Sequence, residues 1–256
     1  MKNKIIAYLN ELEKEKDIKI LFACETGSRA WGFPSPDSDF DIRMVYVHKK
    51  DWYLTLSEKK DNINRMLEDN EIDISGWDLR KSLRLLQKSN AALLERIQSP
   101  ILYKADKDFL KTFNDLAALK YSRIATIHHY LSMSKKFIEE LRENKTYKLK
   151  KFFYALRSAT ACKWILEKEE MPPIEFKKML SDLTLNSKLL KRIDTLIDLK
   201  ATISESYLHE GENELLEFIE TCIKQADDNR KSLPSSKDQL VDLDVFFRKI
   251  ISENDH

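Results

Sequence analysis

Residues 27–32 read Gly-Ser-Arg-Ala-Trp-Gly, and residues 37–43 read Asp-Ser-Asp-Phe-Asp-Ile-Arg. The 256-residue chain has four glycines, and two of them stand in the first of these stretches, directly after the apolar run 18–24. Glycine lets the backbone turn with a positive φ or approach a ligand closely. A second apolar run, 44–47, follows the acids. This order of strand, glycine turn, acid cluster and strand is typical of a site that holds a polyphosphate and its metal ion.

The acid pair Asp39 and Asp41 is predicted to lie on one face of a strand. Successive side chains of a strand point to opposite faces, so these two project together while Phe40 and Ile42 face the core. Paired carboxylates repel each other unless a cation lies between them, and carboxylates with phosphates and water suit Mg²⁺ or Mn²⁺. Arg43 shares their face, where it either pairs with an acid or steadies phosphate charge.

A third carboxylate is expected on a neighbouring strand. In residues 71–74, Glu-Ile-Asp-Ile, acids alternate with isoleucines, and Asp73 is the better candidate because isoleucines flank it on both sides. Together Asp39, Asp41 and Asp73 would allow a two-metal site, with Asp73 binding metal or acting as base toward an attacking hydroxyl. A D-x-D pair alone is more often a solvated face or a turn; the later acid and the glycine turn make the combination specific.

These motifs together resemble the signature of the DNA polymerase β-like nucleotidyltransferase superfamily. More narrowly, the chain is similar to the RlaP-like family of predicted nucleotidyltransferases grouped with RNA-repair genes. The resemblance continues through Trp52, residues 77–81 and 90–95, and more weakly through residues 155–164. It implies transfer of a nucleoside monophosphate from an NTP, such as ATP, to a hydroxyl acceptor with release of pyrophosphate. It also points to an RNA end as the acceptor.

The nucleotide is expected to meet the turn that follows the first strand. Gly27 and Ser28 would offer backbone N–H groups and a hydroxyl to the β- and γ-phosphates. Arg29 lies inside this turn, at a motif position that the family resemblance puts within reach of the nucleotide. Arg43 is a second candidate for phosphate charge.

The stretch 147–163, predicted to be helical, offers a further set of polar side chains. Lys150, Tyr154 and Arg157 fall at i, i+4 and i+7 and form one stripe, which would contact phosphates or the base, or simply be a solvated face. The neighbouring histidines His128 and His129 point about 100° apart on a helix, so they are not expected to share a ligand. One is predicted at the surface and the other packed.

The predicted fold class is α+β. Residues 1–104 are expected to form a nucleotidyltransferase catalytic domain with a small mixed β-sheet. Helical spacing of apolar residues without a convincing strand predicts an all-α domain over 105–256, closing the nucleotide cleft. Residues 61–69 are predicted to be a loop or a hairpin, and residues 238–250 a final helix.

Composition limits the function classes. Charged residues make up 34% of the chain at a net charge of +1, so any nucleic-acid contact must be a local patch. The three cysteines have no metal-ligand spacing, and Cys24 and Cys162 lie in apolar runs typical of buried free thiols. No signal peptide and no membrane span of about 20 apolar residues is recognisable, so we expect a cytoplasmic protein without membrane contact.

The acceptor, the preferred NTP and the oligomeric state are not fixed by these residues. Within the same chemistry, a protein side chain or a small molecule such as an aminoglycoside would serve as acceptor. A non-catalytic nucleotide-binding or scaffolding protein is the alternative from another class. The intact trio of acids argues against it, because a protein without activity need not keep a metal site.

Overall fold

The computed structural model describes residues 1–69, 71–234 and 241–255. The chain divides into two compact units, each described here by itself. The sheet unit contains Met1–Gly27, Asp39–Tyr121 and the described residues 241–255. The helical unit contains Ser28–Ser38 and residues 122–234. The predicted α+β class is confirmed.

The sheet unit is built on a mixed five-stranded sheet with the order β3-β4-β2-β1-β5. β2 runs parallel to β4, and the other neighbouring pairs are antiparallel. The segment predicted as a loop or a hairpin is a hairpin, because β3 pairs with β4. The strands are β1 (Ile18–Glu25), β2 (Phe40–His48), β3 (Asn62–Leu67), β4 (Ile72–Asp78) and β5 (Leu102–Ala105).

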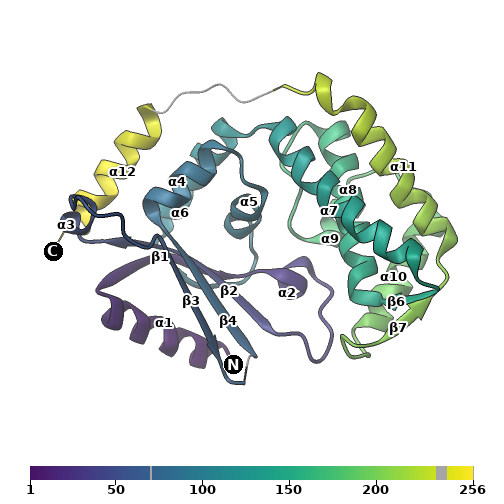
Figure 1. Cartoon of the computed structure of the whole chain (residues 1–256), viewed down its shortest axis with the longest axis horizontal. Coiled ribbons are helices and arrows are strands. Elements are labelled where there is room, and N and C mark those ends of the chain that lie inside the picture. The colour runs from purple at the N-terminus through teal and green to yellow at the C-terminus, as the bar shows by residue number, and fades with distance from the viewer. Residues whose placement is uncertain (70, 235–240, 256) are drawn as a thin grey trace. The chain divides into compact units, whose positions relative to one another are not determined.

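Helices cover both faces of this sheet (Figure 1). On one face lies α1 (Lys2–Lys16), whose buried Ile5, Leu9 and Leu12 pack against alternate residues of the strands, among them Ile42 and Ile74. On the other face lie α4 (Leu79–Gln87), α5 (Ala91–Ile97) and α6 (Lys107–Lys120). Side chains alternate along a strand, so in β2 and in β4 the residues next to those that face α1 point to the opposite face of the sheet.

The predicted domain boundary at 104/105 differs from the division of the structure. Helix α6 packs on β1, with the ring of Phe22 lying 6.3 Å from that of Phe109 and 6.4 Å from that of Phe113. Helix α12 (Val241–Glu253) joins them through Phe246, 5.5 Å from Phe109. Apolar periodicity shows that a helix has a buried face but not which partner covers it. The start predicted for this last helix, at 238, lies outside the described residues.

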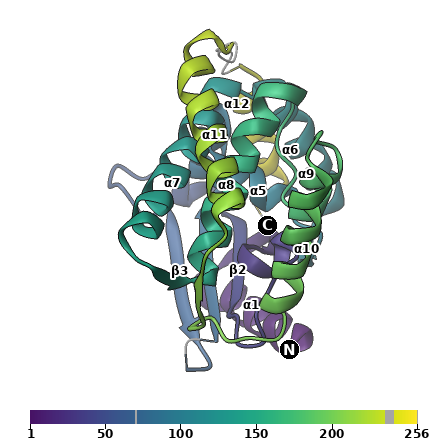
Figure 2. The ribbon, with the colours of Figure 1, turned by 90° about the vertical axis from the view of Figure 1, so that its right-hand side faces the viewer.

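The helical unit is built around α7 (Arg123–Glu143), α8 (Leu149–Lys168) and α11 (Asn213–Asn229), which lie side by side (Figure 2). It also contains α9 (Phe176–Ser181), α10 (Ser187–Lys200) and a 3₁₀ turn over Arg230–Ser232. The expectation of no strand after Lys104 is wrong. β6 (Thr146–Lys148) pairs with β7 (Leu208–Glu210), and strands of three residues are too short to show alternation.

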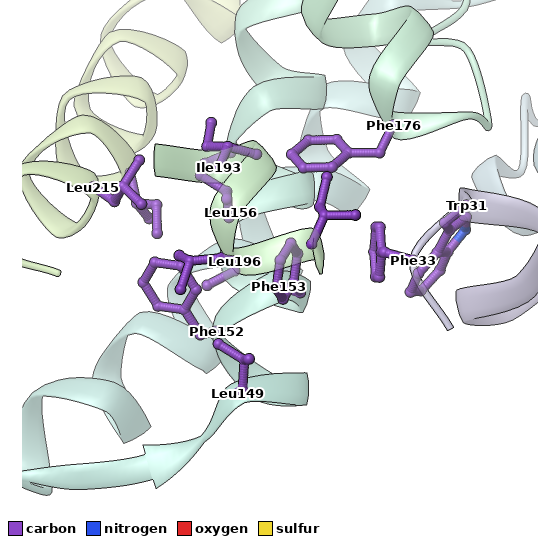
Figure 3. Packing of buried hydrophobic residues seen from close by; sticks show 14 of the residues in the cluster. Trp31, Phe33, Leu149, Phe152, Phe153, Leu156, Phe176, Ile193, Leu196 and Leu215 are labelled. Carbon is purple, nitrogen blue, oxygen red and sulfur yellow. The ribbon is translucent and has the colours of Figure 1, made fainter. Parts of the chain in front are cut away.

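The segment Ser28–Ser38, which connects β1 to β2 in the chain, packs in the core of the helical unit. Trp31 and Phe33 lie among its buried residues (Figure 3). Phe33 stacks on Phe153 at 4.8 Å and meets Phe176 edge-on at 5.7 Å. Helix α2 (Gly27–Trp31) therefore begins in the sheet unit and ends in the helical unit.

Candidate functional site

Asp41 and Asp73 converge on a single cationic group. The parallel pairing of β2 with β4 places these two residues opposite each other. Nη2 of Arg43 donates to Oδ1 of Asp41 at 2.7 Å and to Oδ2 of Asp73 at 2.8 Å. The side chains of Asp41, Asp73 and Arg43 are 24%, 28% and 18% exposed, respectively. The result is a partly buried carboxylate pair with positive charge between its members.

Strand periodicity explains why these three side chains meet. Ile42 and Ile74 are fully or almost fully buried on the α1 side, so Asp41, Arg43 and Asp73 point to the opposite face. The predicted shared face of Asp41 and Arg43 is thus what the strand shows. Of the two roles considered for Arg43, pairing with an acid is the one present here.

Asp39 stands one residue before β2 and is half-buried. In residues 1–69, 71–234 and 241–255, no three or more His, Cys, Asp or Glu side chains are grouped so as to hold a metal ion. The trio of Asp39, Asp41 and Asp73 does not form such a group here. The donor set that does converge is the pair Asp41 and Asp73, and two convergent carboxylates fit a hard divalent cation.

Gly27 lies directly against Asp41. Its φ is +64°, and a Cβ added there would be 2.3 Å from Oδ2 of Asp41. The preceding Thr26 donates its backbone N–H to the Asp41 carbonyl at 2.8 Å. Only glycine combines this backbone conformation with so close an approach. The predicted glycine turn and the predicted acid are therefore in contact.

Sequence reasoning missed Glu25, which positions Asp41 by accepting its backbone N–H. Glu25 is fully buried at the end of β1. Its Oε1 accepts the backbone N–H of Asp41 at 2.6 Å, and its other oxygen accepts the hydroxyl of Tyr103. Ser99 Oγ donates to the Glu25 carbonyl at 2.6 Å. The available signal was an acid two residues before the glycine turn, at the end of an otherwise apolar run.

Arg96 on α5 is a second feature that the sequence did not reveal. It is 6% exposed, and its guanidinium lies over the Trp77 ring at 3.3 Å from the centroid. Among the described residues its Nη1 has no hydrogen-bond partner. Burial lowers the pKa of Arg96 to about 9, helped by the charge of Arg43 and opposed by Cys24 and Asp73. Arg96 therefore stays charged at neutral pH and adds positive potential near the carboxylate pair.

The polar residues of the turn are held by hydrogen bonds inside the helical unit. Ser28 is 8% exposed, and its Oγ donates to Oγ of Ser38 at 3.1 Å. Nη2 of Arg29 donates to the Ser38 carbonyl at 2.6 Å. Ser38 Oγ in turn donates to Glu205 at 2.9 Å. The roles of Ser28 and Arg29 toward phosphates stay predictions.

The stripe on α8 is not a solvated face. Lys150 pairs with Glu205 at 2.6 Å, and the ring of Tyr154 meets that of Trp31 edge-on at 5.0 Å. Arg157 is 3% exposed, lies over the Trp31 ring at 4.5 Å, and donates to the Ile174 carbonyl at 3.0 Å. Each of the three therefore has a structural partner within the helical unit, and their contact with a nucleotide stays a prediction.

The remaining candidates are structural. His128 is exposed and His129 is half-buried against Tyr130. Cys24 and Cys162 are buried free thiols as predicted, and burial raises the pKa of Cys24 to about 12. Among the described residues, no helix has the length and apolar character needed to span a bilayer.

Comparison with known proteins places these residues in a family. The chain is 36% identical over 240 residues to "Uncharacterized protein YcgL" of Bacillus subtilis (strain 168), covering 94% of this chain and 92% of that protein. A shorter match, 25% identical over 132 residues, is to "tRNA (34-2'-O)-methyltransferase regulator WDR6" of Drosophila melanogaster, covering 51% of this chain and 12% of that protein.

Among solved structures, a nucleotidyltransferase-like protein from Exiguobacterium sibiricum 255-15 aligns at 12% identity over 89% of this chain and 75% of that chain. The TM-score of this alignment is 0.32, which is too low to show a shared fold. The family model described as "RlaP: RNA repair pathway DNA polymerase beta family" matches residues 1–249. The chain therefore belongs to the RlaP family, and this membership supports a nucleotidyltransferase-like function.

Proposed function

We propose that the protein is a metal-dependent nucleotidyltransferase that moves a nucleoside monophosphate from an NTP to a hydroxyl acceptor and releases pyrophosphate. The observation that carries the proposal is the carboxylate pair Asp41 and Asp73, whose oxygens meet at one cation position in a chain of the RlaP family. The family description supports an RNA end as the acceptor.

Asp41 and Asp73 would hold Mg²⁺ or Mn²⁺, and a role for Asp39 as a third ligand stays a prediction because it does not group with them here. When bound, such an ion neutralises charge on the phosphates and makes the attacking hydroxyl more acidic. The two carboxylates already lie where the strand register fixes them, so binding would require little rearrangement of the backbone. Glu25 would keep Asp41 in place through the backbone N–H that it accepts.

The reaction would be one of positioning and charge neutralisation, as phosphoryl transfer is in general. Gly27 and Ser28 would hold the β- and γ-phosphates, and Arg29 would approach the same phosphates. The acceptor oxygen would form a bond to the α-phosphorus while the bond from that phosphorus to the bridging oxygen of pyrophosphate breaks. As the alternative to its role as a metal ligand, Asp73 would take the proton of the acceptor hydroxyl.

The experiment is incubation with α-labelled NTPs, Mg²⁺ or Mn²⁺, and separate RNA, DNA and protein acceptors. Asp41→Asn and Asp73→Asn, which preserve the shape of the side chain, are compared with the parent and with Asp51→Asn at an exposed position of α3 (Lys50–Tyr53). We expect label in one acceptor class with the parent and Asp51→Asn. Equal incorporation by the two site variants would show that the catalytic carboxylates are assigned wrongly.

Salt dependence separates the kinds of acceptor. Binding of a polynucleotide weakens steeply as salt rises, because phosphate contacts release counterions. A protein or small-molecule acceptor would not show this slope. If protein is labelled and the affinity of the enzyme for it does not change with salt concentration, the acceptor is a protein side chain and not an RNA end.

A further inference from the structure

The cation between Asp41 and Asp73 is a side chain of the protein itself. We propose that Arg43 is an internal counter-ion that competes with the divalent metal ion for Asp41 and Asp73, so that metal binding displaces its guanidinium. This inference rests on the proposed function, since it concerns the same carboxylates. It adds a condition for loading the site, namely that one cation must leave as another enters.

The contact geometry carries the inference. One nitrogen of Arg43, Nη2, reaches both carboxylates at hydrogen-bond distance, 2.7 Å and 2.8 Å. A metal ion shared by the same two oxygens would need to occupy the region that this nitrogen fills. Both cannot be there at once, because a guanidinium and a divalent ion repel each other and would overlap in space.

The charges show why the protein keeps a cation there before metal arrives. Two carboxylates side by side in a partly buried position repel each other electrostatically. The Arg43 guanidinium relieves this repulsion through charge-assisted hydrogen bonds. The two carboxylates are thus held side by side without a metal ion.

Arg43 has the means to leave. Within the described part of the chain, its second nitrogen, Nη1, donates to two main-chain carbonyls, those of Ile42 and Asp73, each at 3.0 Å. Its side chain reaches the surface with 18% exposure, whereas Arg96, the other guanidinium in this region, is buried on Trp77. Of these two like charges, Arg43 is therefore the one that can move outward.

Displacement has a consequence for the substrate. A guanidinium that leaves the carboxylates carries its charge to the edge of the site, where an anionic triphosphate would stabilise it. Metal and nucleotide would then strengthen each other's binding, and by linkage the two effects are equal in size. Without nucleotide, metal binding is expected to be weak because Arg43 holds the site.

The test is direct Mn²⁺ binding to the full chain without nucleotide, measured by electron paramagnetic resonance of the free ion. We compare the parent with Arg43→Gln and with the control Arg65→Gln, which removes the same charge from β3 where Arg65 pairs with Glu15 of α1. We expect Arg43→Gln to bind Mn²⁺ about tenfold more tightly than the parent, since a competing cation is gone. Arg65→Gln should bind like the parent.

A second measurement on the unaltered protein guards against misfolding of the variant. Phenylglyoxal modification, located by mass spectrometry, reports how accessible the Arg43 guanidinium is. Saturating Mn²⁺ should raise the modification rate of Arg43 several-fold and leave that of Arg65 unchanged. Protection of Arg43 by Mn²⁺, or an unchanged rate, would overturn the displacement.

The outcomes also separate this inference from the proposed function. Equal or weaker Mn²⁺ binding by Arg43→Gln overturns the competition and shows that Arg43 positions the carboxylates instead, while label transfer still tests the enzyme. Absence of Mn²⁺ binding in every variant overturns the competition, whereas absence of label transfer from NTP in the presence of Mn²⁺ overturns the proposed function. Tighter binding together with faster modification supports the exchange of one cation for the other.

Discussion

Replacing Gly27 by alanine should separate the cost of backbone strain from the cost of disturbing Asp41. At φ +64° a residue with a Cβ is strained by about 1–2 kcal/mol. The added methyl would also lie 2.3 Å from Oδ2 of Asp41, so the carboxylate must shift, which disturbs the hydrogen bond that Arg43 donates to its Oδ1. Weakening that partly exposed, charge-assisted hydrogen bond costs a further ~1–2 kcal/mol.

A matched control exists in Gly211, which has a φ of +88° and no heavy atom within 4 Å of an added Cβ. Gly211→Ala carries the backbone term alone. The assay is thermal and chemical unfolding of both variants, where ~1 kcal/mol corresponds to about 2–4 °C for a chain of this size. We therefore expect Gly27→Ala to melt about 2–8 °C below Gly211→Ala.

Function gives an independent reading of the same change. Since the displaced carboxylate is a proposed metal ligand, Gly27→Ala should also lose nucleotidyl transfer, whereas Gly211→Ala should keep it. Equal stability losses in the two variants, with transfer intact in both, would refute the contact between Gly27 and Asp41 as a determinant of the site.

Three further predictions concern other side chains. Glu25→Ala leaves the Asp41 N–H without its buried acceptor and should lower the free energy of unfolding by about 2–3 kcal/mol. Glu25→Gln keeps one acceptor oxygen and should lower it by less. Chemical denaturation of the two variants measures the difference. Burial holds the pKa of His48 at about 4, below its usual value, with help from the charge of Lys59. Its contribution to stability is therefore present above pH ~6.5 and lost as pH falls toward 4. From pH ~6.5 to ~4 the free energy of unfolding of the parent should fall by about 1–3 kcal/mol more than that of His48→Gln. The exposed His128→Gln is the control and should behave like the parent. Arg157→Lys should lower the free energy of unfolding by about 1–3 kcal/mol, because lysine cannot both stack on Trp31 and reach the Ile174 carbonyl. Lys150→Gln removes a partly exposed ion pair with Glu205 and should change it by less than ~1 kcal/mol. Calorimetry of the two variants measures the difference.

Local patterns were sufficient to predict the sheet and much of the carboxylate site. Alternation in β2 placed Asp41 and Arg43 on one face, and the isoleucines around Asp73 identified the strand that pairs with it. These inferences depend on the alternation of apolar and polar residues along a strand, which can be read directly from the sequence.

Features that depend on distant partners were not predictable in this way. The role of Glu25 requires Tyr103 and Ser99, which lie more than seventy residues along the chain. Arg96 looked like one more polar residue of a helix, because nothing local indicates that Trp77 covers its guanidinium. Tertiary contacts of this kind are set by which faces pack, not by local pattern.

The division into units differs from the predicted boundary for the same reason, since apolar periodicity does not show which partner covers a helix. The stretch of residues 27–43 was interpreted as one local object, yet the chain leaves the sheet unit after Gly27 and returns at Asp39. Trp31 and Phe33 are buried apolar side chains that the helical unit needs for its core, so the intervening segment packs there. A motif that is continuous in sequence thus has its metal-binding candidates and its serine-bearing turn fixed by different sets of contacts.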